Sequence, residues 1–359
     1  MNKSNSLFMD GLRVFAALLV FLGHLSYTDF LGNFVWGAPL AEYGFDAVII
    51  FFVLSGFVIG FVADVKEKTG PAYSIARFSR LASVLWPALL ITVGCDVLGH
   101  GFNPSFYDHA WWYSNTHPVA RFGMNMLALN QVAGQDIRAF SNGPLWSVSY
   151  EAWYYLIFGC WYFLPRWRWP ACALGLLLSG PSVAMLFPIW VMGYALYRST
   201  KTTTLPPVVG LLIALAGIVV YALTKAAWGV PHNPQALFGM RLPGAFWGRT
   251  ESLGGAYMTG LCSAALLGGT TIFMRNFDAK HIPFERVIRK LSDCTFPLYA
   301  THYSVIWAIA AVHPTHDAAR TAALLLVPLL VAYLLSIVAR ILRDWIRQAA
   351  DTRWRARPA

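Results

Sequence analysis

The sequence predicts an all-α membrane protein, a polytopic bundle of about ten transmembrane helices with both termini in the cytoplasm. Three observations predict this fold class. Charged residues make up only 12% of the 359 residues, whereas a soluble domain carries roughly 25%. Apolar residues make up 57%, and the mean hydropathy is +0.52. The apolar runs are long and unbroken, whereas a membrane β-barrel shows short strands of alternating polarity.

A spanning helix needs roughly 20 mostly apolar residues, and the chain offers a series of segments near this length. In order they are 11–28, 45–63, 82–99, 146–164, 169–181, 183–198, 206–224, 253–273, 295–312 and 322–342. Gly180-Pro181 separates 169–181 from 183–198, so this pair is either a tight hairpin or one broken re-entrant element. The first segment carries Arg13 and lacks a small-residue cleavage site, which favours a span over a secretory signal.

The basic residues predict the orientation of these spans. With the N-terminus inside, most of the 27 Lys and Arg residues fall on inner segments, as the positive-inside rule requires. The net charge of +10 therefore needs no nucleic-acid partner. We divide the chain into a transmembrane domain, 1–342, and a basic cytoplasmic tail, 343–359, which is expected to lie against membrane lipids. The cysteines and histidines show neither a CxxC pair nor a metal-ligand spacing, so no metal site is predicted.

Ionisable groups within a span are costly, and each is therefore a functional candidate. The first span offers Asp10, Arg13 and His24. Arg13 and His24 are eleven residues apart, so they share one helical face at a separation of roughly 16 Å along the axis. Asp10 lies three residues before Arg13 and can pair with it. The alternatives are a snorkelling anchor for Arg13 and an interhelical hydrogen bond for His24.

The second span begins with Asp46 and contains Ser55-Gly56. Asp46 is either a functional acid or one that complements the helix dipole in the first turn. Ser55-Gly56 either lines a path or allows close helix packing. The inner loop that follows ends in Arg77-Phe-Ser-Arg80, whose guanidinium groups share one face and can grip phosphates. Ordinary positive-inside anchoring is the alternative for this pair.

Two later segments add polar groups at depth. Outer loop 100–145 is rich in aromatic residues and is predicted to be interfacial and partly folded. Glu151 lies in the outer part of the fourth span, and if it faces His24 the two form an acid–imidazole pair of the kind that orients a general base. Tyr299 and His302 lie three residues apart in a late span. A buried, hydrogen-bonded histidine is the alternative for His302.

Five motifs follow one another along the chain. They are Met9-Asp10-Gly11-Leu12-Arg13 with His24, Gly44-Phe45-Asp46 with Phe51 to Ile59, Arg77-Phe78-Ser79-Arg80, Leu145-Trp146-Ser147-Val148-Ser149-Tyr150-Glu151 with Tyr155, and Pro297-Leu298-Tyr299 with His302. In this order the chain resembles the acyltransferase-3 family, integral-membrane O-acyltransferases that modify cell-surface polysaccharides and lipopolysaccharide. Departures at Ser83, Ala152 and Gly159, where many members carry Pro, Glu and Pro, leave the subgroup open.

The resemblance implies the substrates and the location. The donor is an acyl-CoA, commonly acetyl-CoA, which arrives from the cytoplasm as a co-substrate and is not a permanently bound cofactor. The acceptor is a hydroxyl of a glycan or lipid-linked saccharide at the outer face of a bacterial inner membrane. The chain resembles the stand-alone type, without a C-terminal SGNH-type domain.

The resemblance also directs the expected roles of the site residues. We expect His24 to act as general base or as a transient acyl carrier, with Glu151 orienting it. Arg77 and Arg80 are expected to bind donor phosphates, and Arg13 to bind the donor or stabilise developing negative charge. The expected path-lining or supporting residues are Asp10, Asp46, Ser55, Tyr299 and His302.

Two other classes of function suit a chain with buried charges. A transporter or flippase for a lipid-linked glycan would need no covalent chemistry, but transporters often show internal repeats, and this sequence shows none. A purely structural membrane subunit needs no His–Glu pair at depth. An enzyme is therefore the favoured interpretation.

Overall fold

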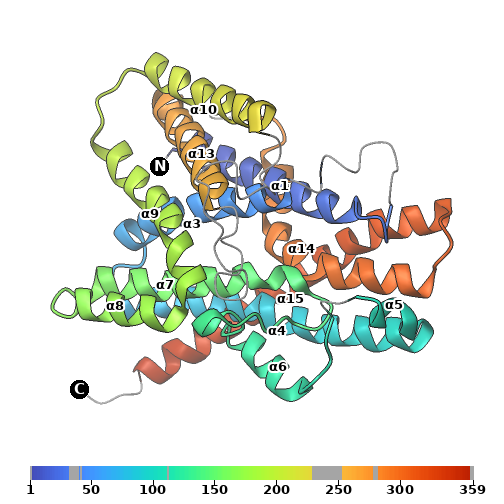
Figure 1. Cartoon of the computed structure of the whole chain (residues 1–359). Coiled ribbons are helices and arrows are strands. Elements are labelled where there is room, and N and C mark those ends of the chain that lie inside the picture. The colour runs from blue at the N-terminus through green and yellow to red at the C-terminus, as the bar shows by residue number, and fades with distance from the viewer. Residues whose placement is uncertain are drawn as a thin grey trace.

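The structure is a computed structural model, and it describes residues 2–31, 40, 43–110, 113–228, 253–277 and 282–355. Helices joined by short turns make up most of this part of the chain, and no β-strand occurs in it. The long helices pack side by side as one bundle (Figure 1). The all-α fold class is thereby confirmed.

In the part of the chain that the structure describes, six helices are long and apolar enough to cross a membrane. They are α1 (Lys3–Leu25), α3 (Gly44–Val65), α4 (Gly70–Phe102), α10 (Pro207–Trp228), α13 (Leu253–Phe273) and α15 (Ala318–Arg355). The remaining predicted segments are also helical, as α7 (Trp146–Phe163), α8 (Arg168–Ser179), α9 (Pro181–Thr202) and α14 (Glu285–Val312). Each predicted segment is therefore a helix, and the number that cross the membrane stays a prediction.

The outer loop is partly folded, as predicted. It contains two short α-helices, α5 (Pro104–Asp108) and α6 (Pro118–Met126), and two 3₁₀ turns, η1 (Val132–Gly134) and η2 (Gly143–Leu145). A third 3₁₀ turn, η4 (Met274–Asn276), follows α13.

The break at Gly180 produces two separate helices. Gly180 has φ +90°, a left-handed conformation that favours glycine, and a Cβ there would lie 2.7 Å from the backbone nitrogen of Gly134. The twelve residues of α8 extend about 18 Å, which is shorter than the roughly 30 Å hydrocarbon core. α8 instead packs along α7 (Figure 1). The pair 169–181 and 183–198 is therefore a short helix followed by a long one, broken at Gly180.

Glycines bring α3 and α9 into backbone contact. A Cβ at Gly56 would lie 1.9 Å from the carbonyl oxygen of Trp190, and one at Gly193 would lie 2.0 Å from that of Val53. Close packing, one of the two interpretations of Ser55-Gly56, is thus what Gly56 provides. Trp190 is fully buried against Phe158, with ring centroids 5.3 Å apart.

The helices that carry the predicted motifs meet in the middle of the bundle. α14 packs against α1, α4 and α15, and α3 packs against α1, α9 and α13. α10 packs chiefly on α13 and lies at the edge of the bundle (Figure 1). The motif residues of α1, α3, α4, α7 and α14 can therefore reach a shared space.

Several helix boundaries differ from the sequence prediction, since α1 begins at Lys3 rather than at 11 and α14 begins at Glu285 rather than at 295. Arg77 and Arg80 were expected at the end of an inner loop but lie inside α4, which begins at Gly70 after the capping residue Thr69. The Thr69 hydroxyl accepts a hydrogen bond from the backbone N–H of Ala72 at 3.4 Å, and Pro71 occupies the first turn. The segment 343–355 continues α15 without a break, and 356–359 lie outside the described residues.

Candidate active site

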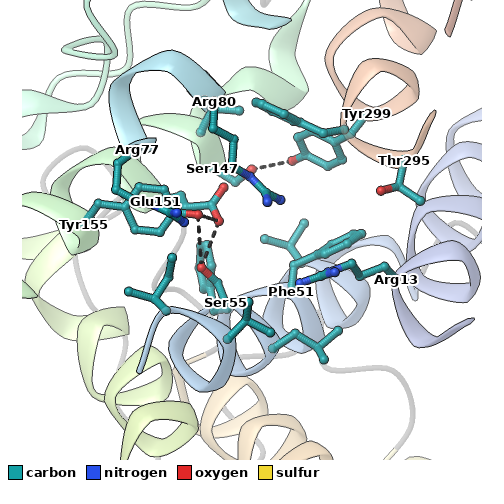
Figure 2. Close-up of a pocket in the computed structure, with 17 residues that line it drawn as sticks. Arg13, Phe51, Ser55, Arg77, Arg80, Ser147, Glu151, Tyr155, Thr295 and Tyr299 are labelled. Carbon is teal, nitrogen blue, oxygen red and sulfur yellow. Dashed lines mark hydrogen bonds between the residues drawn. The ribbon is translucent and has the colours of Figure 1, made fainter. Parts of the chain in front are cut away.

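A cavity of about 80 Å³ lies where α1, α3, α4, α7 and α14 meet. The predicted site residues that line it are Arg13, Ser55, Arg77, Arg80, Glu151 and Tyr299. Figure 2 shows the guanidinium groups of Arg13 and Arg80 pointing into the space beside Glu151. We call this space the arginine cavity. It brings the first four sequence motifs and Tyr299 of the fifth together.

Hydroxyl groups hold Glu151 in the arginine cavity. The Ser55 hydroxyl donates a hydrogen bond of 2.9 Å to Glu151 Oε1, and the Tyr155 hydroxyl, one helical turn beyond, donates to the same oxygen (Figure 2). The Trp190 indole N–H donates to Ser55 Oγ at 3.1 Å. Ser55 therefore fixes the carboxylate and is itself fixed by the packing of α9 on α3.

Arg77 and Arg80 have different surroundings despite their shared motif. Arg77 is buried, and its Nη2 lies 2.6 Å from Glu67 Oε1. The aromatic rings of Tyr73 and Tyr155 flank the Arg77 guanidinium at 5.8 and 5.7 Å. Arg80 has no carboxylate partner among the described residues. Arg80 is therefore the member of the pair that is better placed to bind an anion.

The predicted pair between Asp10 and Arg13 is confirmed. Arg13 Nη1 lies 3.0 Å from Asp10 Oδ1. Arg289 Nη1 lies 3.1 Å from the other Asp10 oxygen, and the Ser292 hydroxyl donates to Asp10 at 3.1 Å. Asp10 thus links α1 to α14 and holds the Arg13 guanidinium at the edge of the arginine cavity.

His24 and His302 form a histidine pair near the end of α1. His24 Nδ1 lies 2.9 Å from His302 Nε2. His302 Nδ1 lies 2.9 and 3.0 Å from the carbonyl oxygens of Leu298 and Tyr299. Carbonyl oxygens only accept hydrogen bonds, so His302 Nδ1 carries a proton.

The hydrogen bonds of His302 also assign the tautomer of His24. His302 is fully buried, and burial favours its neutral ring, in which Nε2 has a lone pair and accepts. His24 Nδ1 must then be the donor, and the lone pair of neutral His24 resides on Nε2. A histidine in this tautomer can accept a proton at Nε2.

Glu151 was expected to contact and orient His24, but the structure separates the two residues. Glu151 lines the arginine cavity with Arg13, whereas His24 is eleven residues farther along the chain, about 16 Å along α1. His24 does not line that cavity. The orienting contact predicted for Glu151 is therefore supplied by His302, which had been expected only to support the site.

Asp46 lies apart from the arginine cavity. It is 1% exposed and forms an ion pair with Lys225 of α10. The hydroxyls of Tyr221 and Thr259 donate to its two oxygens at 2.8 and 2.9 Å. Asp46 occupies the first turn of α3, as predicted, but it binds α10 and α13 to α3 rather than lining a path.

Two supporting residues were missed in the sequence. Asn142 donates from Nδ2 to Thr92 Oγ1 at 2.9 Å and to the carbonyl oxygen of Ala300 at 2.8 Å. Asp96 accepts the backbone N–H of Ser141 at 2.9 Å. These bonds anchor the residues just before the fourth motif, through Asp96 to α4 and through Asn142 to α4 and α14. Asp96 is an acid within the predicted span 82–99, so the rule that singled out Glu151 would also have found it.

Tyr299 connects the two parts of the site. Its hydroxyl donates to the carbonyl oxygen of Pro144 at 2.8 Å, and it lies 2.6 Å from Ser147 Oγ (Figure 2). The carbonyl group of Tyr299 accepts from His302. One turn of α14 therefore carries both a residue of the arginine cavity and the partner of His24.

Comparisons with known proteins identify the family of the chain. The family model described as "Acyltransferase domain", that of acyltransferase-3, matches residues 6–339. Acyltransferase MdmB of Streptomyces mycarofaciens is 26% identical over 317 residues, which cover 83% of this chain and 78% of that protein. Peptidoglycan O-acetyltransferase OatA of Listeria monocytogenes serovar 1/2a is 27% identical over 214 residues. That match covers 55% of this chain and only 28% of the longer protein.

No solved structure matches the chain. The family model covers nearly the whole sequence, and both relatives are acyltransferases by name. The long apolar helices place the protein in a membrane. The chain belongs to the acyltransferase-3 family and is an integral-membrane O-acyltransferase.

Proposed function

We propose that this enzyme transfers an acetyl group from cytoplasmic acetyl-CoA to a hydroxyl of a cell-surface polysaccharide, lipopolysaccharide or lipid-linked saccharide, in a bacterial inner membrane. The observation that carries the proposal is that α1 and α14, two of the helices that line the arginine cavity, also carry the histidine pair. Arginines suit the phosphates of an acyl-CoA, and an imidazole with a lone pair suits a hydroxyl acceptor.

The donor is bound by guanidinium groups in this proposal. Arg80, which has no carboxylate partner in the described part of the chain, contacts the donor directly, and Arg77 stands beside it. Arg13 binds the donor or stabilises negative charge that develops on it. The pantetheine arm of CoA is long and thin, so it extends the thioester from the arginine cavity toward His24.

His24 is the base that activates the acceptor. Its Nε2 takes the hydroxyl proton as the acceptor oxygen bonds to the thioester carbon. The carbon–sulfur bond then breaks, and the proton passes to the departing thiolate, which leaves as CoA. In the alternative route His24 carries the acetyl group as a transient acyl-imidazole.

Glu151 takes a different role from the one the sequence indicated. Its carboxylate lies among Arg13, Arg77 and Arg80, held by Ser55 and Tyr155. It offsets part of the positive charge and directs the guanidinium groups toward the donor.

The acceptor is proposed to be a glycan because OatA is named a peptidoglycan O-acetyltransferase.

The proposed reaction is tested by replacing its base. We expect His24→Ala to abolish glycan O-acetylation, measured by NMR of the glycan isolated from cells, because no other group would take the hydroxyl proton. The matched control is His109→Ala, which removes an exposed histidine at the end of α5. Normal acetylation by a well-expressed, correctly inserted His24→Ala variant would remove His24 from the mechanism.

An assay of CoA release by the purified protein distinguishes an enzyme that uses acyl-CoA from a protein that does not. Purified enzyme should release free CoA from acetyl-CoA over many turnovers only when the acceptor is present, and a thiol reagent measures that release. Without acceptor, release of one CoA per enzyme would report the acyl-imidazole route. A transporter or flippase would release none, and release over many turnovers without any acceptor would contradict the proposed transfer.

A further inference from the structure

The spacing of the Arg77-x-x-Arg80 motif occurs twice more in the chain. Arg286 and Arg289 lie three residues apart in α14, and Arg340 and Arg343 lie three residues apart in α15. Arginines at this spacing share one helical face. Both additional pairs also fit the positive-inside bias, and neither belongs to the family motifs quoted above.

The structure gathers members of all three pairs around a second cavity. This cavity has a volume of about 280 Å³ and lies between α1, α4, α14 and α15. Five arginines line it, Arg13, Arg80, Arg289, Arg340 and Arg343. We call it the α15 cavity. It shares Arg13, Arg80, Thr295 and Phe296 with the arginine cavity, so the two spaces adjoin.

Carboxylates neutralise only part of the positive charge in the α15 cavity. Its acids are Asp10 and Asp293. Asp10 forms ion pairs with Arg13 and Arg289 at 3.0 and 3.1 Å. Asp293 lies 3.7 Å from Arg340 in an exposed pair. Arg80 and Arg343 have no carboxylate partner among the described residues. The cavity therefore has an excess of guanidinium groups.

The side chain of Arg343 supplies a second observation that points to an anion. Its Nε is buried and makes no hydrogen bond with the described residues. A buried donor without a partner is costly, and a guanidinium is suited to bidentate binding of a phosphate. A phosphate group in the α15 cavity would satisfy this donor and the excess charge together.

We propose that the α15 cavity binds phosphate groups, those of the nucleotide end of the acyl-CoA donor, through Arg340 and Arg343. This inference rests on the proposed function, because it takes acyl-CoA as the donor. CoA carries a 5′-diphosphate and a 3′-phosphate at the end opposite its thioester. The phosphates of the donor then lie between Arg340 and Arg343 of α15 and Arg80, which lines both cavities. The pantetheine arm extends from there through the arginine cavity toward His24.

The headgroup of an anionic lipid offers the same phosphate chemistry. α15 carries many exposed apolar side chains, including Leu326, Leu330 and Ile341, so lipids can approach its surface. The experiment therefore has to separate a nucleotide phosphate from a lipid phosphate.

The test measures binding of adenosine 3′,5′-bisphosphate and of CoA to the full chain, by isothermal titration calorimetry in phosphatidylcholine nanodiscs. We expect the double variant Arg340→Gln, Arg343→Gln to weaken both Kd values by at least about tenfold, because charge-assisted bonds to phosphate are lost. The KM for acetyl-CoA should rise by a similar factor, and kcat should stay within about twofold. The control Arg286→Gln removes an exposed arginine that has the same spacing but does not line the cavity.

Specific outcomes overturn the inference. Wild-type enzyme that transfers acetyl groups normally, together with a double variant that binds nucleotide equally well, would contradict the site and leave the proposed function standing. The site is likewise contradicted if no nucleotide binds and an anionic lipid, detected by mass spectrometry, copurifies with the wild type but not with the double variant. Nucleotide binding that depends on Arg340 and Arg343 in an enzyme that transfers no acetyl group would support the site and contradict the proposed function.

Discussion

Single residues in this site owe their chemistry to the hydrogen bonds around them. His24 is half-buried, and its Nδ1 is hydrogen-bonded to His302 Nε2. His302 donates from Nδ1 to two backbone carbonyls, so its Nε2 accepts the proton of His24 Nδ1. The backbone of α14 thus determines which nitrogen of His24 bears the proton. In the familiar catalytic triad a carboxylate has this role, whereas here a neutral imidazole has it.

The first prediction concerns His302. We expect His302→Ala to lower kcat by about 100-fold, which is within the usual contribution of a positioned general base, and to leave the KM for acetyl-CoA unchanged. His302→Gln should retain much more activity, because an amide oxygen can accept the hydrogen bond from His24 Nδ1. Steady-state kinetics of the purified variants measures both effects.

A separate readout distinguishes orientation from simple packing. In the wild type, ¹⁵N NMR of labelled histidine should report a protonated Nδ1 and an unprotonated Nε2 for His24, assigned by comparison with His24→Ala. Equal loss of activity in His302→Gln and His302→Ala, or a signal from protonated Nε2 in neutral His24, would contradict the assigned tautomer.

At the scale of helices, close contacts between backbones connect the packing to the site. Gly56 and Gly193 let α3 and α9 touch, and this contact places the Trp190 indole against Ser55, which in turn holds Glu151. The ion pair between Asp46 and Lys225 likewise holds helices together, because it joins α3 to α10. The arginine cavity therefore depends on residues that do not line it.

The second prediction concerns the contact between α3 and α9. An alanine Cβ at position 193 would lie 2.0 Å from the carbonyl oxygen of Val53, so Gly193→Ala must separate the helices. We expect a loss of about 1–3 kcal/mol in the free energy of unfolding, together with reduced activity as the Trp190–Ser55 hydrogen bond lengthens. Thermal denaturation and acetyl-transfer assays measure the two effects.

The matched control is another helical glycine. A Cβ at Gly94 in α4 would meet nothing within 4 Å, and alanine is the better helix former by about 0.5–1 kcal/mol. Gly94→Ala should therefore be neutral or slightly stabilising. If Gly193→Ala behaves like Gly94→Ala, the proposed role of backbone contact between α3 and α9 is wrong.

For the molecule as a whole, the arrangement of charge predicts the orientation in the membrane and, in the proposed reaction, the side from which the donor enters. In Figure 1 α1 begins and α15 ends toward the left of the view, and the arginines of the α15 cavity lie on these two helices and on α4 and α14. The donor and the positive-inside charges would therefore share one side of the membrane. The third prediction tests that orientation.

The third prediction is that both termini lie in the cytoplasm. A green fluorescent protein fused after the last residue should fluoresce in bacterial cells, and alkaline phosphatase fused at the same point should be inactive. The reason is the excess of arginine near the end of α15, which resists translocation. Active phosphatase at this position would overturn the predicted orientation and would place the α15 cavity on the outer side.

Much of the fold was predictable because hydropathy acts over whole segments. Every predicted segment is helical, and 253–273 coincides with α13. Boundaries were less predictable where local sequence competes with hydropathy. The segment 70–81 is helical although it carries Arg77 and Arg80, because Thr69 caps it and Arg77 pairs with Glu67. α8 is short because Gly180 adopts a left-handed conformation.

The sequence by itself determined the helical class, the family and most members of the site, because periodicity, hydropathy and motif order reside in the chain. Only the tertiary structure decided which polar groups meet. A helical sequence shows that Arg13 and His24 share a face, yet it cannot show which other helix faces each of them. That choice depends on how several helices pack, and it placed His302 beside His24 and left Glu151 with the arginines.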